Sequence, residues 1–248
     1  MDTSTPTSTD REQPVRHRDW MTLATEEYRR LDALLTELSD EEWRLPTDCG
    51  EWDVRDMVAH LVGAAEAGAS MKALLHQARL GRRARPGEPG VDGMNAVQVQ
   101  ERADAEPGRL RSDLVTTAAR AVRRRSGLPA ALRAMRVPFG PPLGTKPLGY
   151  LMDCIYTRDA WMHRVDISRA TGRALFLTPD HDGRIVADVV AEWARGHGQP
   201  YRLTLTGAAG GSWSDGDGES HTLDAVEFCR IMSGRASGDG LLAHQVPF

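Results

Sequence analysis

The segment LGYLMDCIYTRDAWMHRVDISRATG, residues 148–172, carries the clearest helical pattern in the chain. Its apolar residues recur at helical spacing, which predicts a helix from about Leu148 to Ala170 that stops at Gly172. Polar and apolar side chains share one stripe with a 4-3-4-3 spacing: Met152, Tyr156, Asp159, His163 and Asp166. The stripe lies on or beside the buried face, so a carboxylate and an imidazole are directed into the interior.

Burial of such groups must be compensated, and the sequence allows two explanations. Asp159 can accept a hydrogen bond from His163 one turn later, which needs nothing else. Alternatively, the two residues form half of a metal site. His60 favours the second explanation, because it follows Met57 by three residues and also belongs to the buried face of a helix. Two imidazoles and one carboxylate are the protein ligands of an open zinc site; manganese, iron and nickel accept the same set.

Three further helical segments lie before residue 148 in the sequence. The first, in residues 20–39, carries an apolar leucine stripe, and the second runs from Val54 to about Leu80 behind Asp53 as N-cap. The third runs from about Asp92 to Arg125 and is interrupted or kinked near Pro107. The segments 83–90 and 137–147 are rich in proline and glycine and are expected to be loops. Four long segments of this kind predict an antiparallel four-helix bundle over 15–174.

The pattern changes after residue 174, and residues 175–248 are expected to form a small α/β domain. Thr178 and Pro179 resemble the N-cap and first position of a helix. YRLTLTG, residues 201–207, alternates with period two and predicts a strand, and a last amphipathic helix is expected to stop at Gly234.

Composition sets the remaining limits. The 248 residues carry 31 basic and 35 acidic side chains, so the formal charge of −4 gives no electrostatic basis for nucleic-acid binding. No apolar run is long enough for a membrane span, and residues 1–14 read as a disordered tail without a signal sequence. Three scattered cysteines do not suggest a disulfide framework. We therefore expect a cytoplasmic protein, either a monomer or a homodimer.

The chain also resembles a known family. The segment LDALLTELSDEEWRLPTDCGEWDVRDMVAHLVG (31–63) looks like the opening of the mycothiol-dependent maleylpyruvate isomerase family, within the DinB-like helical bundles. The family pattern is matched by Trp43, Pro46, Thr47, Cys49, Trp52, Val54, Asp56, His60 and Leu61. YTRDAWMHRVDISRATGR (156–173) and EFCRIMSGRASGDGLL (227–242) resemble its later signatures.

The resemblance implies a mainly α protein, a DinB-like four-helix bundle followed by a small α/β domain. It implies a divalent metal, expected to be zinc, held by His60, Asp159 and His163. The classical isomerase has glutamate where this chain has Asp159, which leaves the substrate open. It further implies mycothiol as a low-molecular-weight thiol cosubstrate that isomerises or conjugates a small electrophile.

Three other residues are candidates for the site. Tyr156 lies on the ligand stripe and can donate a proton or line the pocket, or it is a core tyrosine. Asn95 can bind the cofactor, or it is a polar residue of the helix surface. Arg235 can bind a substrate carboxylate in bidentate fashion, or it is a surface arginine.

The cysteines are expected to take no part as nucleophiles. Cys154 faces away from the ligand stripe, Cys49 is in a loop, and Cys229 is in the second domain. Two other functions stay open: a non-catalytic metal-binding sensor or regulatory bundle, and a metal-dependent hydrolase in which bound water is the nucleophile.

Overall fold

A computed structural model describes residues 14–50, 52–87, 90–140 and 144–248 of the chain. The tail expected at 1–14 lies outside these residues except for Pro14. The chain divides into two compact units. One is His17–Ala174; the other contains Leu175–Phe248 together with residues 14–16.

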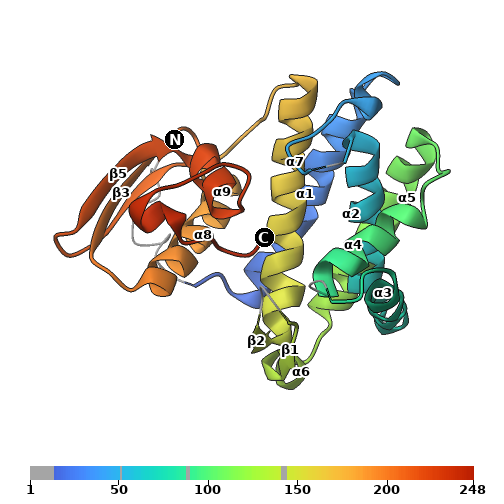
Figure 1. The fold of residues 1–248 in the computed structure, drawn as a ribbon, viewed down its shortest axis with the longest axis horizontal. Coiled ribbons are helices and arrows are strands. Elements are labelled where there is room, and N and C mark those ends of the chain that lie inside the picture. The colour runs from blue at the N-terminus through green and yellow to red at the C-terminus, as the bar shows by residue number, and fades with distance from the viewer. Residues whose placement is uncertain (1–13, 51, 88–89, 141–143) are drawn as a thin grey trace, which may run out of the picture. The chain divides into compact units, whose positions relative to one another are not determined.

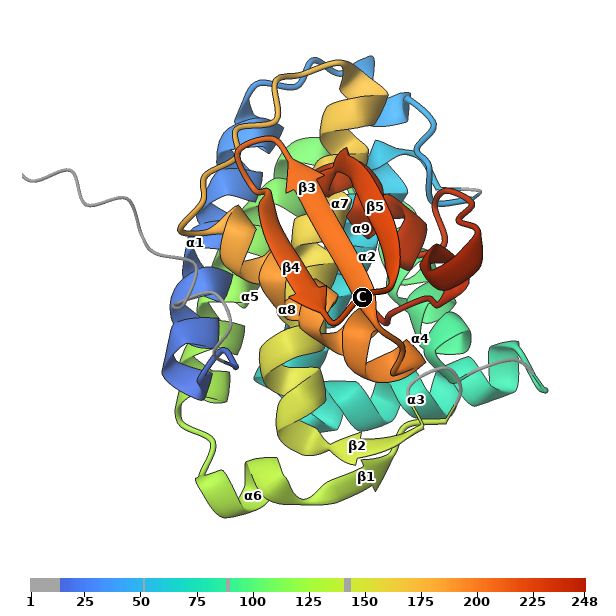
Figure 2. The same cartoon turned by 90° about the vertical axis from the view of Figure 1, so that its left-hand side faces the viewer.

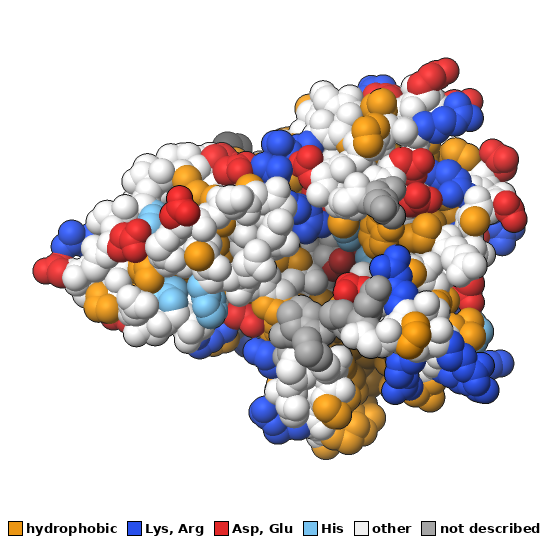
Figure 3. All heavy atoms as spheres, in the orientation of Figure 1, with side chains coloured by type: hydrophobic (Ala, Val, Ile, Leu, Met, Phe, Trp, Pro, Cys, Tyr) orange, Lys and Arg blue, Asp and Glu red, His pale blue; other side chains and the backbone are white. Residues whose placement is uncertain are grey.

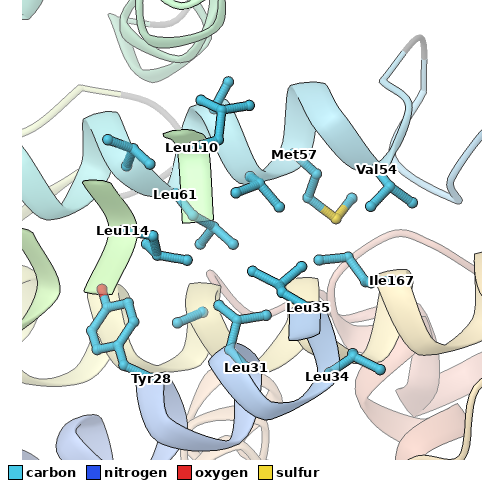
Figure 4. Close-up of a cluster of buried hydrophobic side chains, with 14 of the residues drawn as sticks. Tyr28, Leu31, Leu34, Leu35, Val54, Met57, Leu61, Leu110, Leu114 and Ile167 are labelled. Carbon is cyan, nitrogen blue, oxygen red and sulfur yellow. The ribbon is translucent and has the colours of Figure 1, made fainter. Parts of the chain in front are cut away.

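The first unit is a four-helix bundle with additional elements, as the sequence predicts (Figure 1). The bundle helices are α1 (His17–Thr36), α2 (Val54–Ala69), α5 (Pro107–Ser126) and α7 (Tyr156–Thr171), and the short 3-10 helix η2 (Glu42–Arg44) follows α1. Apolar side chains from all four helices point toward one another in the centre (Figure 4). Leu31, Met57, Leu61, Leu110 and Ile167 are almost completely buried there. The packing of this core fixes which side chains of α2 lie opposite which side chains of α7.

The helix expected from Val54 to Leu80 is in fact two helices. α2 ends at Ala69, and α3 (Met71–Ala84) begins after Ser70, whose backbone is extended. The Ser70 hydroxyl accepts a hydrogen bond from the Ala73 amide and so caps α3. This break lets α3 turn away and pair with α4 (Gly90–Gln100) as a helical hairpin beside the bundle (Figure 1).

The third predicted segment is likewise divided. α4 ends at Gln100, and α5 begins with Pro107 in its first turn, where the missing amide hydrogen is tolerated. The interruption expected near Pro107 is therefore a complete break between two helices.

The connection before α7 contains structure that the sequence does not suggest. The short helix α6 (Ala130–Ala134) leads to β1 (Arg136–Pro138) and β2 (Thr145–Pro147), which form an antiparallel hairpin. A π-helical segment, η3 (Tyr150–Ile155), then runs into α7. Helical conformation therefore begins at Leu148, as predicted, but it passes through the π-helical segment before regular α7 starts at Tyr156. Gly172 ends α7 in the left-handed conformation, as expected.

The second unit contains a three-stranded sheet with helices on one side (Figures 1 and 2). β3 (Tyr201–Thr206) is central, antiparallel to β4 (Gly211–Asp215) and parallel to β5 (Glu219–Asp224). The helices are α8 (Asp182–His197) and α9 (Ala225–Met232), followed by the 3-10 helix η4 (Gly240–Ala243). Trp193 packs edge-on against Tyr201 and Phe228 and joins helix to sheet.

The start of α8 differs from its prediction. The helix begins at Asp182, not at Pro179, and the Asp182 carboxylate accepts a hydrogen bond from the Thr178 amide. The end of α9 agrees with its prediction, because Gly234 follows the helix with a positive φ.

Within the described residues, no helix combines the length and the apolar character that a membrane span requires. Side chains of both charges appear on the face shown in Figure 3, and neither sign covers it alone.

Candidate metal centre

The loop before α2 carries the first part of the site. The Thr47 amide donates to the Trp52 carbonyl (3.1 Å), and the Thr47 hydroxyl donates to the same oxygen (2.8 Å). Asp53 then caps α2 by accepting from the Asp56 amide. These bonds hold the Trp52 ring 5.0 Å from the ring of His60 and 6.3 Å from that of His163, measured between centroids. The Trp52 indole therefore forms an apolar wall beside both imidazoles.

Three side chains converge between α2 and α7. His60 comes from α2, and Asp159 and His163 come from adjacent turns of α7. The Nε2 atom of His60 is 3.3 Å from Asp159 Oδ2, and the Nε2 atom of His163 is 3.2 Å from Asp159 Oδ1. One potential ligand atom from each residue lies within 4.8 Å of the other two. Both histidines are buried, while the Asp159 side chain is 20 % exposed.

The other ring nitrogen of each histidine already has an acceptor. His60 Nδ1 lies 2.7 Å from Gln98 Oε1, and His163 Nδ1 lies 3.1 Å from the buried Asp166 carboxylate. An amide oxygen and a carboxylate accept hydrogen bonds, so each Nδ1 carries the hydrogen in the neutral ring. The lone pair of each Nε2 is then directed at the Asp159 carboxylate.

The protons on the two imidazoles determine how Asp159 is stabilised. Burial raises the pKa of Asp159, but when His163 and His60 are protonated their charges and hydrogen bonds outweigh burial and hold the pKa well below its usual range. When both rings are neutral with the hydrogen on Nδ1, the Asp159 carboxylate instead faces two nitrogen lone pairs, which is an arrangement of acceptors without a donor. It requires a proton or a cation at its centre, and the donor set of two imidazoles and one carboxylate fits a divalent metal ion.

Tyr156 lies one turn before Asp159 but belongs to a separate apolar group with Ala64, Leu148 and Met152. Burial raises the pKa of its phenol, and the Arg125 guanidinium lies 5.7 Å from the centre of its ring. Among the described residues no hydrogen bond joins Tyr156 to His60, Asp159 or His163. The structure therefore places it beside the centre, not within it.

The remaining candidates are not gathered at the centre. Asn95 is half-buried on α4, three residues before Gln98, and forms no hydrogen bond with the cluster in the part of the chain that the structure describes. Arg235 belongs to the other unit, where it lines a cavity of about 340 Å³ with Ser237 and Gln245. Cys154 and Cys229 are buried thiols, and Cys49 is half-buried in the loop before α2.

Gln77 and Gln98 were not among the predicted site residues. Both are buried, on α3 and α4, and Gln98 contacts His60 directly. A signal for Gln77 does exist, because it follows Leu74 by three residues and precedes Gly81 by four, on the packed face of α3. Gln98, which bonds to Gln77 from the neighbouring helix α4, has no such local signal.

Comparison with known proteins agrees with this architecture. Two solved structures, a mycothiol-dependent maleylpyruvate isomerase and a mutant of it in which one histidine is replaced by alanine, each superpose with a TM-score of 0.60 at 17 % identity. Each match covers 94 % of this chain and 93 % of the other, which shows a common fold. No curated protein sequence matches the chain. The family model described as the mycothiol maleylpyruvate isomerase N-terminal domain matches residues 24–168, and the chain belongs to that family.

Proposed function

We propose that this protein is a metal-dependent enzyme that uses a low-molecular-weight thiol, mycothiol, to isomerise or conjugate a small electrophile. The observation that carries the proposal is the convergence of His60 Nε2, His163 Nε2 and the Asp159 carboxylate, with each Nδ1 already hydrogen-bonded. Three protein ligands leave a fourth position for a water or a thiol. The similar solved structures are described as mycothiol-dependent maleylpyruvate isomerase, which supports the choice of thiol and reaction class.

A bound divalent cation, zinc in this proposal, would lower the pKa of a coordinated thiol so that the thiolate is present at neutral pH. The chain's own residues prepare the position. His60 and His163 present lone pairs in fixed tautomers, and the Asp159 carboxylate lies beside both of them as the third ligand group. Trp52 covers one side of both imidazoles and limits the access of water.

The thiol in this proposal comes from outside the protein. Cys154 and Cys229 are buried, and neither belongs to the group of atoms that converges on Asp159. A thiolate adds to an activated double bond, permits rotation about the resulting single bond, and leaves again in an isomerase. In a transferase the carbon–sulfur bond is kept. Tyr156 as a pocket residue, Asn95 in cofactor binding and Arg235 as a binder of a substrate carboxylate stay predictions, as do a cytoplasmic location and a monomeric or homodimeric state.

The first test is metal content by elemental mass spectrometry on the untagged protein, His163→Ala and the control His76→Ala. His76 is exposed and pairs with Glu101, so its loss should not affect the centre. We expect about one equivalent of metal in wild type and the control, and nearly none in His163→Ala. Wild-type protein that stays metal-free after reconstitution with zinc would refute the proposal.

Turnover then separates the functional classes. If the electrophile is consumed only when mycothiol is added, the protein is a thiol-dependent enzyme. Hydrolysis that proceeds without thiol supports a metal hydrolase, and metal binding without any turnover supports a sensor or regulatory bundle.

A further inference from the structure

A chain of buried amides leads from the metal centre into the α3–α4 hairpin. His60 Nδ1 lies 2.7 Å from Gln98 Oε1, and the Gln98 amide nitrogen donates to Gln77 Oε1 at 2.8 Å. The Gln77 amide nitrogen in turn donates to the Gly63 carbonyl at 2.9 Å. Gln77 and Gln98 are 1 % and 3 % exposed, so solvent does not compete for these bonds.

The chain of hydrogen bonds has one direction only. A backbone carbonyl only accepts, so Gln77 must turn its nitrogen toward Gly63 and its oxygen toward Gln98. Gln98 must then give its nitrogen to Gln77, which leaves its oxygen facing His60. His60 can satisfy that oxygen only with a hydrogen on Nδ1. The Gly63 carbonyl therefore determines, through two side chains, that the His60 Nε2 lone pair faces Asp159.

Glycines permit the close packing that this chain requires. A Cβ atom on Gly63 would lie 2.6 Å from Gln98 Cβ, so no other residue at position 63 leaves Gln98 in its place. Gly81 and Gly93 bring α3 and α4 into direct backbone contact, since a Cβ on Gly81 would lie 2.6 Å from the Gly93 carbonyl carbon. The hairpin that carries both glutamines is thus held tightly against itself and against α2.

We infer that Gln98 and Gln77 are positioning residues that fix the tautomer of His60 and thereby set the affinity of the centre for its cation. The two histidines are supported differently: His163 by the carboxylate of Asp166, and His60 by a neutral amide. Partners of this kind orient metal-binding histidines and fix their tautomer. The affinity part of the inference rests on the proposed function, whereas the tautomer is a property of the metal-free protein.

The test is long-range ¹H–¹⁵N NMR of the histidine rings in metal-free protein at pH 8.5, well above the ordinary histidine pKa of about 6.5. We expect His60 in wild type to be the Nδ1–H tautomer. Gln98→Leu should shift His60 toward the Nε2–H form, which the free side chain prefers. His163 is the internal reference, because its Asp166 partner is unchanged. Gln100→Leu, an exposed position on the same helix, is the matched control.

The second measurement is the affinity for zinc, by competition with a chromophoric chelator. Gln98→Leu should lower it roughly 10- to 100-fold, and Gln100→Leu should leave it unchanged. Gln77→Leu keeps the contact between Gln98 and His60 but frees the Gln98 amide to rotate, so it should give a mixture of His60 tautomers and a smaller loss.

Two results would overturn the inference: an Nε2–H tautomer of His60 in the wild-type protein, or an unchanged tautomer in both glutamine variants. Circular dichroism of each variant shows whether the helices are intact, and Gln77→Leu tests the chain if Gln98→Leu fails to fold. Wild type that binds no metal would refute the proposed function but leave the tautomer measurement decisive for the inference.

Discussion

His163 Nδ1 lies 3.1 Å from the carboxylate of Asp166, one turn later on α7 and completely buried. The same helix therefore supplies two proposed ligands, Asp159 and His163, and the group that orients one of them. A carboxylate behind an imidazole raises the basicity of the ring toward a metal on the other side.

Replacement of Asp166 by asparagine keeps the shape of the side chain and removes its charge. We expect the affinity for zinc to fall about 10-fold or more, because the His163 ring becomes a weaker donor. Asp113→Asn, a partly exposed position that pairs with Arg109 on α5, is the control. Equal affinities for the two variants, measured by chelator competition, would mean that Asp166 only packs against the helix.

The residue after His163 has a structural role. The Arg164 guanidinium binds the Glu27 carboxylate in bidentate fashion, with distances of 2.6 and 3.2 Å, and so joins α7 to α1. Both side chains are buried. Removal of the Arg164 guanidinium takes away the two hydrogen bonds and the opposite charge that it gives the buried Glu27 carboxylate, so Arg164→Ala should lower the free energy of unfolding by about 3–5 kcal/mol.

Urea denaturation measures this loss. Arg169→Ala is the matched control on the same helix, because Arg169 is 47 % exposed and pairs with Asp48 at the surface. We expect the control to change the free energy of unfolding by less than about 1 kcal/mol. Similar losses for both variants would show that the buried pair contributes no more than a surface pair.

The sequence predicts those features that depend on the period of a helix. The 4-3-4-3 spacing from Met152 to Asp166 places Asp159 and His163 on one face, and the position of His60 relative to Met57 does the same on α2. That face becomes the interior because the four helices have no other apolar side to bury. The bundle and the approach of the three side chains follow from this local geometry.

Features that depend on contacts between distant segments could not be predicted in this way. The extended backbone at Ser70 allows α3 to leave the direction of α2, yet the surrounding alanines favour a continuous helix. Gln98 meets His60 across 38 positions, and nothing on α4 identifies which helix it will face. The β1–β2 hairpin is similarly determined by pairing across a segment that reads as a loop.

A surface contact gives the first unit a dependence on pH. Arg173, just beyond the end of α7, binds Glu42 through two bonds of 2.8 Å, and the Ser39 amide donates to the same carboxylate. The hydrogen bond from Arg173 and that from Ser39 lower the pKa of Glu42 from 4.5 to about 2. A carboxyl group with a lowered pKa stabilises the folded state above its unfolded value and loses this contribution as the pH falls.

Glu42→Gln should therefore be less stable than wild type at pH 7, and the difference should shrink as the pH falls from 4.5 toward 2. Chemical denaturation of both proteins across this range measures it. Glu106→Gln, an exposed position with no capping hydrogen bond, should show no such convergence. A difference that is the same at pH 3 and pH 7 would mean that the charge of Glu42 does not contribute.

The two glycines on α2 allow a test that is independent of any metal. Alanine has a better helix propensity than glycine by up to about 1 kcal/mol. Both substitutions therefore gain the same stabilisation from helix propensity. At Gly68 the nearest atoms to a new Cβ are 3.6 Å away, which is ordinary contact, and Gly68→Ala should be neutral or stabilising.

At Gly63 the new Cβ would overlap the side chain of Gln98. Overpacking of this kind costs about 1–3 kcal/mol, so Gly63→Ala should be destabilising despite its better helix propensity. The midpoint of thermal unfolding should therefore fall below that of wild type in Gly63→Ala and stay equal or rise in Gly68→Ala. If Gly63→Ala were as stable as Gly68→Ala, α4 would be free to move away from α2, and Gln98 would not be held against His60 by close packing.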